Sequence, residues 1–167
     1  MQTAHVQSWF IVSLVKTSAR LAAGLTVAAL ASLIFASLVQ ADPLLTYPLR
    51  IKHHEVRVEV ANTEAQRLRG LMHRERLAED GGMIFVYPRP EVTAMWMKNT
   101  RIALSVAFID ADGRILNIED MTPFTEDAHA SRGAAAYSLE MNKSWFARRG
   151  IKAGDRVEGL AALPPAQ

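Results

Sequence analysis

Residues 102–119 read IALSVAFIDADGRILNIE, and this stretch decides the fold. Large apolar residues at every second position alternate with Ala103, Ser105 and Ala107, which predicts a β-strand over 102–109. The sequence DADG at 110–113 predicts a hairpin loop with Gly113 at positive φ, and residues 114–119 form the return strand. We therefore expect an antiparallel hairpin whose large side chains fill the core and whose small ones allow close packing.

A second alternating pattern precedes this hairpin, because valines at 56, 58 and 60 are separated by charged residues. It predicts a half-buried strand over 56–60. Thr63 and Gln66 then have the spacing of a capping box, which predicts a short helix that Gly70 ends. We expect Leu68 of this helix to face the core.

The remaining elements follow from apolar runs and turn residues. A turn is predicted at 80–82 (DGG), and a second short helix is expected to be capped by Asn142 and ended by Gly150. Further strands are predicted over 83–87, 92–97, 134–141 and 156–160. The chain is therefore expected to be mainly β (α+β by content), a compact antiparallel sandwich or barrel of about seven strands with two short helices.

The N-terminal part of the chain is expected to be a targeting segment. Residues 21–39 carry no charge, and Lys16 and Arg20 precede them, as in an export signal. We expect residues 1–41 to be a signal peptide cleaved after Ala41, or alternatively an uncleaved membrane anchor, since residues 21–39 are nearly long enough to span a bilayer. The protein is thus expected to be periplasmic or secreted, or anchored to the inner membrane by residues 21–39.

Behind this leader we expect one domain. Residues 42–53 are expected to form a linker or an incoming strand, residues 54–160 a single mainly-β domain, and residues 161–167 a disordered tail. A domain of this length can bury one core.

Charge and cysteine content exclude several kinds of function. The chain has 19 Lys and Arg, of which two precede residue 42, and 17 Asp and Glu, all of which follow residue 41, so residues 42–167 are neutral overall. We therefore expect no nucleic-acid partner. The absence of Cys excludes disulfides, thiolate metal sites and Cys nucleophiles, and we expect neither a metal nor a cofactor.

Several short sequence blocks follow one another in a characteristic order along the chain. They are GLM at 70–72, GMIF at 82–85, WMKNT at 96–100, FID at 108–110, LE at 139–140, and GI at 150–151 with GD at 154–155. Over roughly residues 54–160 this order resembles domain-of-unknown-function family 192, a group of small, often exported bacterial and archaeal proteins. The resemblance implies a mainly-β sandwich or barrel with short helices.

The chain departs from the pattern of that family at two positions. Members usually have Asp where this chain has Ser105, and Gly is common where it has Ser144. If the missing carboxylate were a metal ligand or general base, this chain would lack it, which puts a catalytic role at that position in doubt.

The candidate ligand-binding surface is the stretch MWMKNT at 95–100. Trp96 is either a core residue or a platform for a sugar or apolar ligand. Lys98, Asn99 and Thr100 supply a cation, an amide and a hydroxyl for an anion or carbonyl. Alternatively they form a turn, in which Asn99 adopts the left-handed conformation and Thr100 satisfies backbone groups.

Other polar residues give further candidates. Arg69 and Arg74 could form a basic rim around a ligand, or belong to a solvated helix end. Glu140 is a candidate ligand-binding or acid–base residue. A loop holds Glu126, Asp127, His129 and Ser131, which resemble a hydrolytic constellation or, with His53 or His54, a weak metal site.

Three functions remain open on these grounds. The favoured one is a non-enzymatic binding or accessory module, which contacts a small polar ligand or an envelope protein through residues 96–100. The second is a cell-envelope hydrolase or transferase that uses Glu140, His129 or Asp127 as acid or base. The third, a structural subunit, would expose a large apolar patch and no pocket.

Overall fold

A computed structural model of the protein describes residues 45–167. The predicted leader, its cleavage after Ala41 and the alternative anchor over 21–39 lie outside the described residues. Within 45–167, no helix is both long and apolar enough to cross a bilayer.

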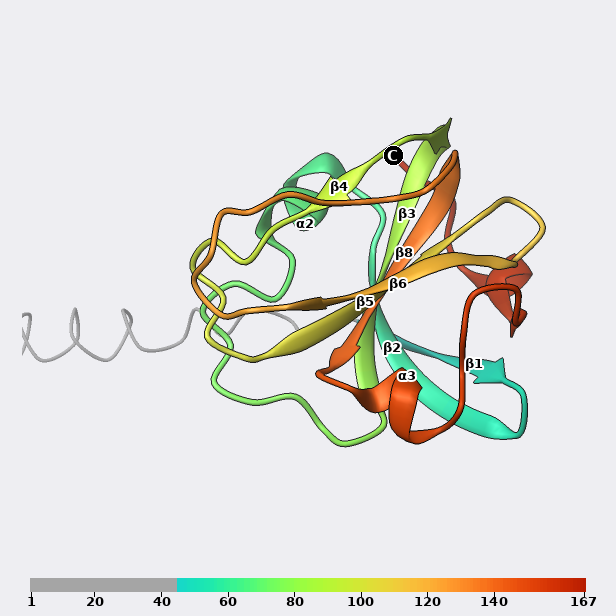
Figure 1. The fold of residues 1–167 in the computed structure, drawn as a ribbon. Helices are drawn as coiled ribbons and strands as arrows, with labels where there is room; N and C mark the ends of the chain where they lie inside the picture. The colour runs from blue at the N-terminus through green and yellow to red at the C-terminus, as the bar shows by residue number, and fades with distance from the viewer. Residues whose placement is uncertain (1–44) are drawn as a thin grey trace, which may run out of the picture. The chain divides into compact units, whose positions relative to one another are not determined.

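The described chain is mainly β, with nine strands and two short α-helices, so the predicted fold class is confirmed (Figure 1). Seven strands form one sheet in the order β6-β5-β8-β3-β2-β1-β9, and β4 pairs with β7 in a separate ribbon. The strands are β1 (Thr46–Ile51), β2 (His54–Ala61), β3 (Gly81–Glu91), β4 (Ala94–Met95), β5 (Leu104–Ile109), β6 (Ile115–Met121), β7 (His129–Ala130), β8 (Ala135–Asn142) and β9 (Val157–Glu158). The helices are α2 (Glu64–Arg69), α3 (Trp145–Arg148) and the 3-10 helix η1 (Leu160–Ala162).

We had predicted an antiparallel arrangement, but β2 and β3 run parallel. The α2 helix and the loop up to residue 80 lie between these two strands in sequence and provide the crossover that a parallel pair requires. The predicted hairpin over 102–119 is present as β5 and β6, and Gly113 in its loop has a φ of 81°.

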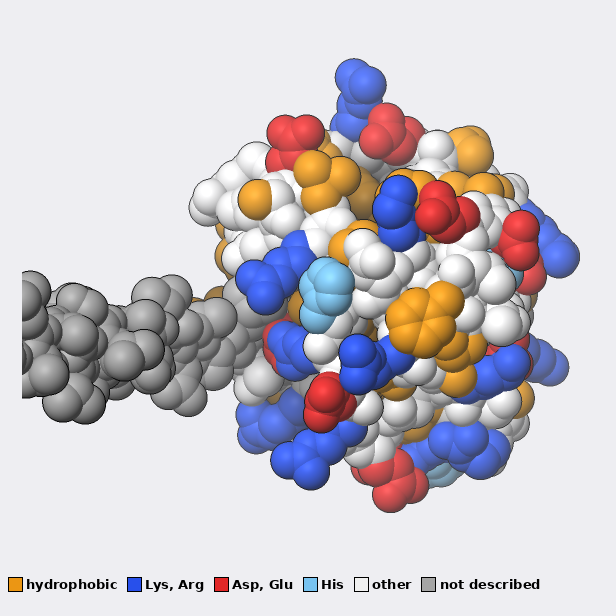
Figure 2. All heavy atoms as spheres, turned by 90° about the vertical axis from the view of Figure 1, so that its left-hand side faces the viewer, with side chains coloured by type: hydrophobic (Ala, Val, Ile, Leu, Met, Phe, Trp, Pro, Cys, Tyr) orange, Lys and Arg blue, Asp and Glu red, His pale blue; other side chains and the backbone are white. Residues whose placement is uncertain are grey.

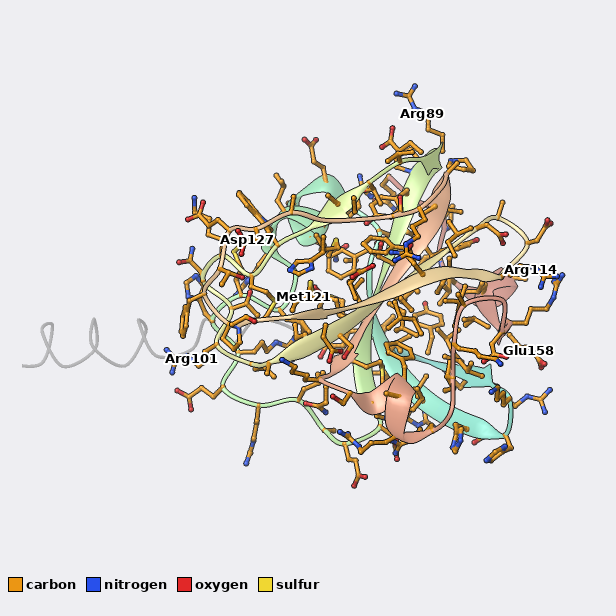
Figure 3. All side chains as sticks on the ribbon, viewed as in Figure 1. Arg89, Arg101, Arg114, Met121, Asp127 and Glu158 are labelled. Atoms are coloured by element: carbon orange, nitrogen blue, oxygen red, sulfur yellow. The ribbon has the colours of Figure 1, made fainter. Side chains whose placement is uncertain are left out.

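The seven-stranded sheet curls until its two edges meet. Arg114, just before β6, forms an isolated antiparallel bridge with Arg156, just before β9. The amide of Ile115 donates to the carbonyl of Asp155 at 2.9 Å, and Val157 donates to Gly113 at 2.8 Å. Figure 3 shows Arg114 and Glu158 on the same side of the sheet, where these edges approach each other. The sheet is therefore a half-barrel joined at one point.

Both faces of this sheet are buried. One core lies inside the curl and includes Ile84 of β3 and Leu139 of β8, with Trp145 and Phe146 of α3 against them. The other lies between the opposite face and the layer of loops, and includes Phe85 and Met97 among its residues (Figure 1). Because both faces are covered, all six residues of β5 are buried, and the small ones allow close packing, as we expected.

The α2 helix begins with the predicted capping box. The side chain of Thr63 accepts from the amide of Gln66, and the side chain of Gln66 accepts from the amide of Thr63. Leu68, however, is 69% exposed, and Leu71 after the helix enters the core instead. Our prediction for Leu68 was wrong, since the six-residue helix has no buried residue.

Several predicted boundaries moved. The β3 strand continues to Glu91 through two prolines, which occupy the interval where its register with β8 shifts and which therefore interrupt no regular ladder. The strand predicted over 92–97 is only the two-residue β4, because residues 96–100 turn away. The turn predicted at 80–82 is strand from Gly81 onward. The strand predicted over 156–160 is only the two-residue β9.

The C-terminal tail is packed against the domain rather than disordered. Leu163 is buried, and the amide of Gln167 donates to the carbonyl of Asn62 at 2.7 Å. The Asn62 side chain donates in turn to the carbonyl of Pro165 at 2.8 Å. Our expectation of disorder rested on the two prolines and overlooked these partners. Similarly, the segment expected as a linker or incoming strand contains β1, which pairs along its whole length with β2.

The two departures from the family pattern lie next to each other. Ser144, rather than Asn142, is the N-cap of α3, and it has a left-handed φ of 62°. Its backbone amide donates to Ser105 Oγ at 2.8 Å, and Ser105 donates to the Asp120 carboxylate. Ser105 is buried at this junction and joins β5, β6 and the start of α3, so its role in this chain is structural.

Ser144→Gly is expected to stabilise the protein by about 0.5–1 kcal/mol. The left-handed conformation costs a residue with a Cβ atom, whereas Gly adopts it freely and keeps the amide that donates to Ser105. Urea midpoints would measure the gain. Ser144→Ala is the matched control, since it also loses the hydroxyl but keeps the Cβ atom, and an equal gain in both variants would contradict the conformational explanation.

Candidate functional site

Residues 97–100 form a compact turn after β4, as the structural alternative predicted. Asn99 has a φ of 54°, in the left-handed region. The amide of Thr100 donates to the carbonyl of Met97 at 3.0 Å, and its hydroxyl donates to the carbonyl of Lys98 at 3.1 Å. The carbonyl of Asn99 also accepts from the amide of His73 at 3.0 Å. This turn therefore fixes the loop layer against the segment that follows α2.

Lys98 lies on the outside of this turn. Its Nζ atom is 5.2 Å from the centroid of the Trp96 ring and 3.7 Å from a carboxylate oxygen of Glu126. Both charged side chains are largely exposed, so this pair contributes little to stability. Of the two methionines that flank Trp96, Met97 is fully buried, whereas Trp96 itself keeps 46% of its surface exposed.

A cavity of about 470 Å³ lies beneath Trp96, and we name it the Glu140 pocket. Its walls come from α2 and the residues that follow it, from the second half of β3, and from β4 with Trp96 and Thr100. The larger apolar and aromatic side chains that line it are Leu68, Leu71, Met72, Phe85, Tyr87, Met95 and Trp96. Figure 2 shows hydrophobic side chains reaching the surface among charged ones on the face formed by the loop layer.

Glu140 gives the pocket its one deeply buried ionisable group. It lies on β8 between Met83 of β3 and Val106 of β5, and only 3% of its surface is exposed. Among residues 45–167, no group forms a hydrogen bond or ion pair with its carboxyl group. Every fully buried side-chain oxygen and nitrogen in these residues has a partner, so the carboxyl group of Glu140 is not fully buried. The small exposed part of the carboxyl group therefore faces the pocket. Burial raises the pKa of Glu140 to about 8, so that the group is mainly protonated at neutral pH.

Tyr87 supplies a second polar group beside Glu140. Its hydroxyl is 3.0 Å from Ser138 Oγ, which is fully buried two residues before Glu140 on β8. The Met95 sulfur lies 3.6 Å from the same hydroxyl. Burial raises the pKa of Tyr87, although the hydrogen bond to Ser138 opposes this rise, so the hydroxyl stays protonated and donates to Ser138 Oγ.

The pocket collects four of the seven predicted site residues. Trp96, Thr100, Arg69 and Glu140 all line it. Lys98 and Asn99 belong to the turn and do not line it. The seventh residue, Arg74, lies at a different cavity.

That second cavity is larger, at about 740 Å³, and lies beside β1, β2 and the loop before β3. Glu59, Arg74 and Asp80 of its lining already have protein partners, and its other charged residues, Glu55, Arg57 and Arg76, are exposed. Arg74 pairs with both carboxylate oxygens of Glu59, one of them at 2.7 Å. Asp80 accepts from Trp145 Nε1 at 2.9 Å and from Arg149 at 2.7 Å. We therefore place the candidate site at the smaller Glu140 pocket, where a buried carboxyl group has no partner in the part of the chain that the structure describes.

The polar loop over 126–131 does not assemble into a catalytic constellation. His129 lies on β7 opposite Met95, and Ser131 Oγ donates to the carbonyl of Gly133 at 2.7 Å. Figure 3 shows Asp127 on the loop layer, away from the sheet. None of these three residues lines the Glu140 pocket. No cluster of three metal-binding side chains occurs within residues 45–167.

The two adjacent histidines at the β1–β2 turn belong to another part of the fold. The rings of His53 and His54 are 4.0 Å apart, and the His54 ring meets the edge of Trp145 at 6.2 Å. Desolvation lowers the pKa of His54, and the neighbouring His53 lowers it further. These contacts place His54 against α3 as a packing residue.

The sequence analysis missed Tyr87 and Ser138, and it proposed Glu140 without its surroundings. A signal was present, because β8 has polar residues at 138, 140 and 142, all on one face of an otherwise apolar strand. Two of them, Ser138 and Glu140, are buried. Polar residues with this spacing on a central strand indicate a buried polar site.

Comparison with known proteins agrees with this architecture. The chain matches a crystal structure of a protein of unknown function from Novosphingobium aromaticivorans DSM 12444, with 35% identity over 73% of this chain and 91% of that one, at a TM-score of 0.68. It also matches a candidate transcription regulator from Sinorhizobium meliloti 1021, with 37% identity over 72% of this chain and 97% of that one, also at 0.68. No curated protein matches the chain.

A family model also matches most of the domain. It covers residues 47–159, from β1 to the residue after β9, and therefore includes every wall of the Glu140 pocket. Its description is "Uncharacterized ACR, COG1430". The chain belongs to this family, domain-of-unknown-function family 192 (DUF192).

Proposed function

We propose that this protein is a non-enzymatic binding module that holds a small ligand in the Glu140 pocket. One observation carries the proposal: Glu140 is only 3% exposed, and its carboxyl group has no partner among residues 45–167 and faces a cavity lined by aromatic side chains. Folded proteins rarely leave a buried polar group without a partner, so such a group inside a pocket indicates a ligand. The exposed Trp96 ring provides a surface against which that ligand can pack.

We place this activity outside the cytoplasm. The uncharged residues 21–39, preceded by Lys16 and Arg20, support export to the periplasm. The equal numbers of acidic and basic residues over 42–167 give no support for nucleic-acid binding, so we do not extend the description of the Sinorhizobium meliloti protein to this chain.

Glu140 also supports a second candidate function, that of an envelope hydrolase or transferase. A carboxyl group with a pKa of about 8 in a cleft is a suitable general acid. Among the described residues, however, no His side chain lines the pocket, and the carboxylate that pairs with Lys98, that of Glu126, is on the outside of the turn. Binding is therefore the better-supported function.

A thermal-shift screen tests the binding proposal. We expect at least one compound among amines, sugars, cell-wall fragments and small carboxylates to raise the unfolding midpoint of the wild type. Trp96→Ala should lose most of that shift, because it removes the exposed wall of the pocket. Val92→Ala is the matched control, since Val92 is an exposed apolar residue outside the pocket lining.

Two outcomes would count against this function. If the stabilising compound shifts Trp96→Ala and the wild type equally, the compound binds elsewhere. If an envelope fragment is hydrolysed by the wild type and not by Glu140→Gln, the protein is a hydrolase rather than a binding module.

A further inference from the structure

The chemistry of the Glu140 pocket narrows the class of its ligand, an inference that rests on the proposed function. A ligand must satisfy two features of the cavity: the buried carboxyl group of Glu140 and the aromatic rings of Phe85, Tyr87 and Trp96. An ammonium group matches both, because it pairs with a carboxylate and is attracted to the faces of aromatic rings.

The basic residues of the pocket do not provide a free site for an anion at this depth. The Arg67 guanidinium donates to the backbone carbonyls of Asn62 at 2.6 Å, Val86 at 3.1 Å and Gln167 at 3.2 Å. These three bonds hold it at the junction of β2, β3 and the C-terminal tail. Its N–H groups are therefore occupied by the fold.

The other charged residues of the lining come from α2 and β3. Arg69 and Glu64 lie on the six-residue α2, no residue of which is buried, and Glu91 pairs with Arg89 at 3.5 Å on the surface. These groups lie at the rim. At the bottom of the pocket, Glu140 is the one group among the described residues that can carry a charge near neutral pH.

We infer that the ligand is a small organic cation, a primary amine or quaternary ammonium compound with an apolar body. Its ammonium group lies against the Glu140 carboxylate, and its body packs between Phe85, Tyr87 and Trp96. An anionic ligand would meet a like charge whenever Glu140 is ionised, and a purely apolar ligand would leave the carboxyl group without a hydrogen-bond partner.

Binding of such a cation should release a proton. Unliganded Glu140 is mainly protonated at pH 7, because burial favours its neutral form. A bound ammonium favours the ionised form, and the carboxyl proton then passes to the buffer. A neutral ligand in the same pocket would leave that proton in place.

Isothermal titration calorimetry with three probes of similar shape tests this inference. The probes are 2-phenylethylamine, 2-phenylethanol and 3-phenylpropionate, and the protein is purified from cells that express the full coding sequence. We expect the amine to bind about tenfold more tightly than the alcohol, and the acid to bind most weakly. Titrations at pH 7 in two buffers with different ionisation enthalpies should show that the amine alone releases a proton.

Glu140→Gln separates the charge from the shape of the pocket. This substitution should weaken binding of the amine about tenfold and abolish proton release, while binding of the alcohol stays within about twofold. Retained binding of the alcohol also shows that the variant is folded. Glu75→Gln, which removes an exposed carboxylate outside the pocket lining, is the matched control and should leave both properties unchanged.

The possible failures are distinguishable. If the alcohol or the acid binds as tightly as the amine, the pocket binds ligands but the inferred class is wrong. If the amine binds equally to Glu140→Gln, the carboxyl group does not recognise it, and the inference is also overturned. If none of the three probes binds at millimolar concentration, the inferred class is rejected. The proposed function would then be rejected as well only if the broad thermal-shift screen also gave no hit.

Discussion

Glu140→Gln is expected to be more stable than the wild type at pH 9 and to lose the pH dependence of stability that Glu140 confers. Burial raises the pKa of Glu140 in the folded protein to about 8, against a value of 4.5 for an unperturbed Glu. Between these two values the folded state binds more protons than the unfolded state, so the free energy of unfolding of the wild type falls as the pH rises. The contribution of Glu140 is fully present below pH 4.5 and is lost as the pH passes through 8. A shift of this size corresponds to a loss of about 3–5 kcal/mol.

Urea unfolding at a series of pH values between 4 and 9 would measure this loss. Gln has the shape of the protonated carboxyl group and no charge, so the curve of the variant should lack the fall that Glu140 causes over the same interval. Glu126→Gln, a substitution on the exposed loop, is the control and should keep the slope of the wild type. A wild-type protein that is equally stable at pH 5 and pH 9 would show that the Glu140 carboxyl is already compensated in the folded state.

Gly82→Ala is expected to destabilise the protein by about 3 kcal/mol. Gly82 lies inside β3, opposite Met141 of β8, and a Cβ atom there would lie 2.6 Å from the carbonyl oxygen of Glu140 and in collision with the Met141 sulfur. The carbonyl belongs to a central strand that is paired on both sides, so it cannot move away without breaking its ladder. Overpacking at such a position forces the backbone of β3 and β8 apart.

Gly133→Ala provides the matched control for this prediction. Its Cβ atom would meet only the Leu116 side chain, at 3.7 Å, which is an ordinary contact. We expect its free energy of unfolding, measured with urea, to change by less than about 0.5 kcal/mol. Equal losses in both variants would mean that the intrinsic preferences of Gly and Ala, rather than the close approach of β8, determine the result.

The parts of the fold that the sequence predicted are those whose causes are local. The capping box at Thr63 and Gln66 and the loop that ends at Gly113 depend on residues only a few positions apart, and both are present. The strands over β5, β6 and β8 were also found, because runs of apolar residues on central strands are a strong signal.

The parts that the sequence could not predict depend on contacts between distant segments. Leu68 has the helical position of a core residue, but α2 is too short to bury it. Gly82 resembled a turn residue, whereas its actual constraint is the Glu140 carbonyl on a strand nearly sixty residues away. The candidate site shows the same limit, since Trp96, Thr100, Arg69 and Glu140 converge only after β3, β4, β8 and α2 are assembled.

The bridge between Arg114 and Arg156 has a consequence for how copies of this protein behave in a crowded compartment. A strand at the border of a sheet normally offers unpaired amides and carbonyls to which a foreign strand can add. Here Gly113 and Ile115, on either side of Arg114, bond to the backbone of Val157, Asp155 and Gly154. Further along β6, the Asn117 side chain bonds to the backbone of Ala130 and Arg132. By closing on itself at this point, the chain pairs edge groups to which a strand of a neighbouring molecule could otherwise add.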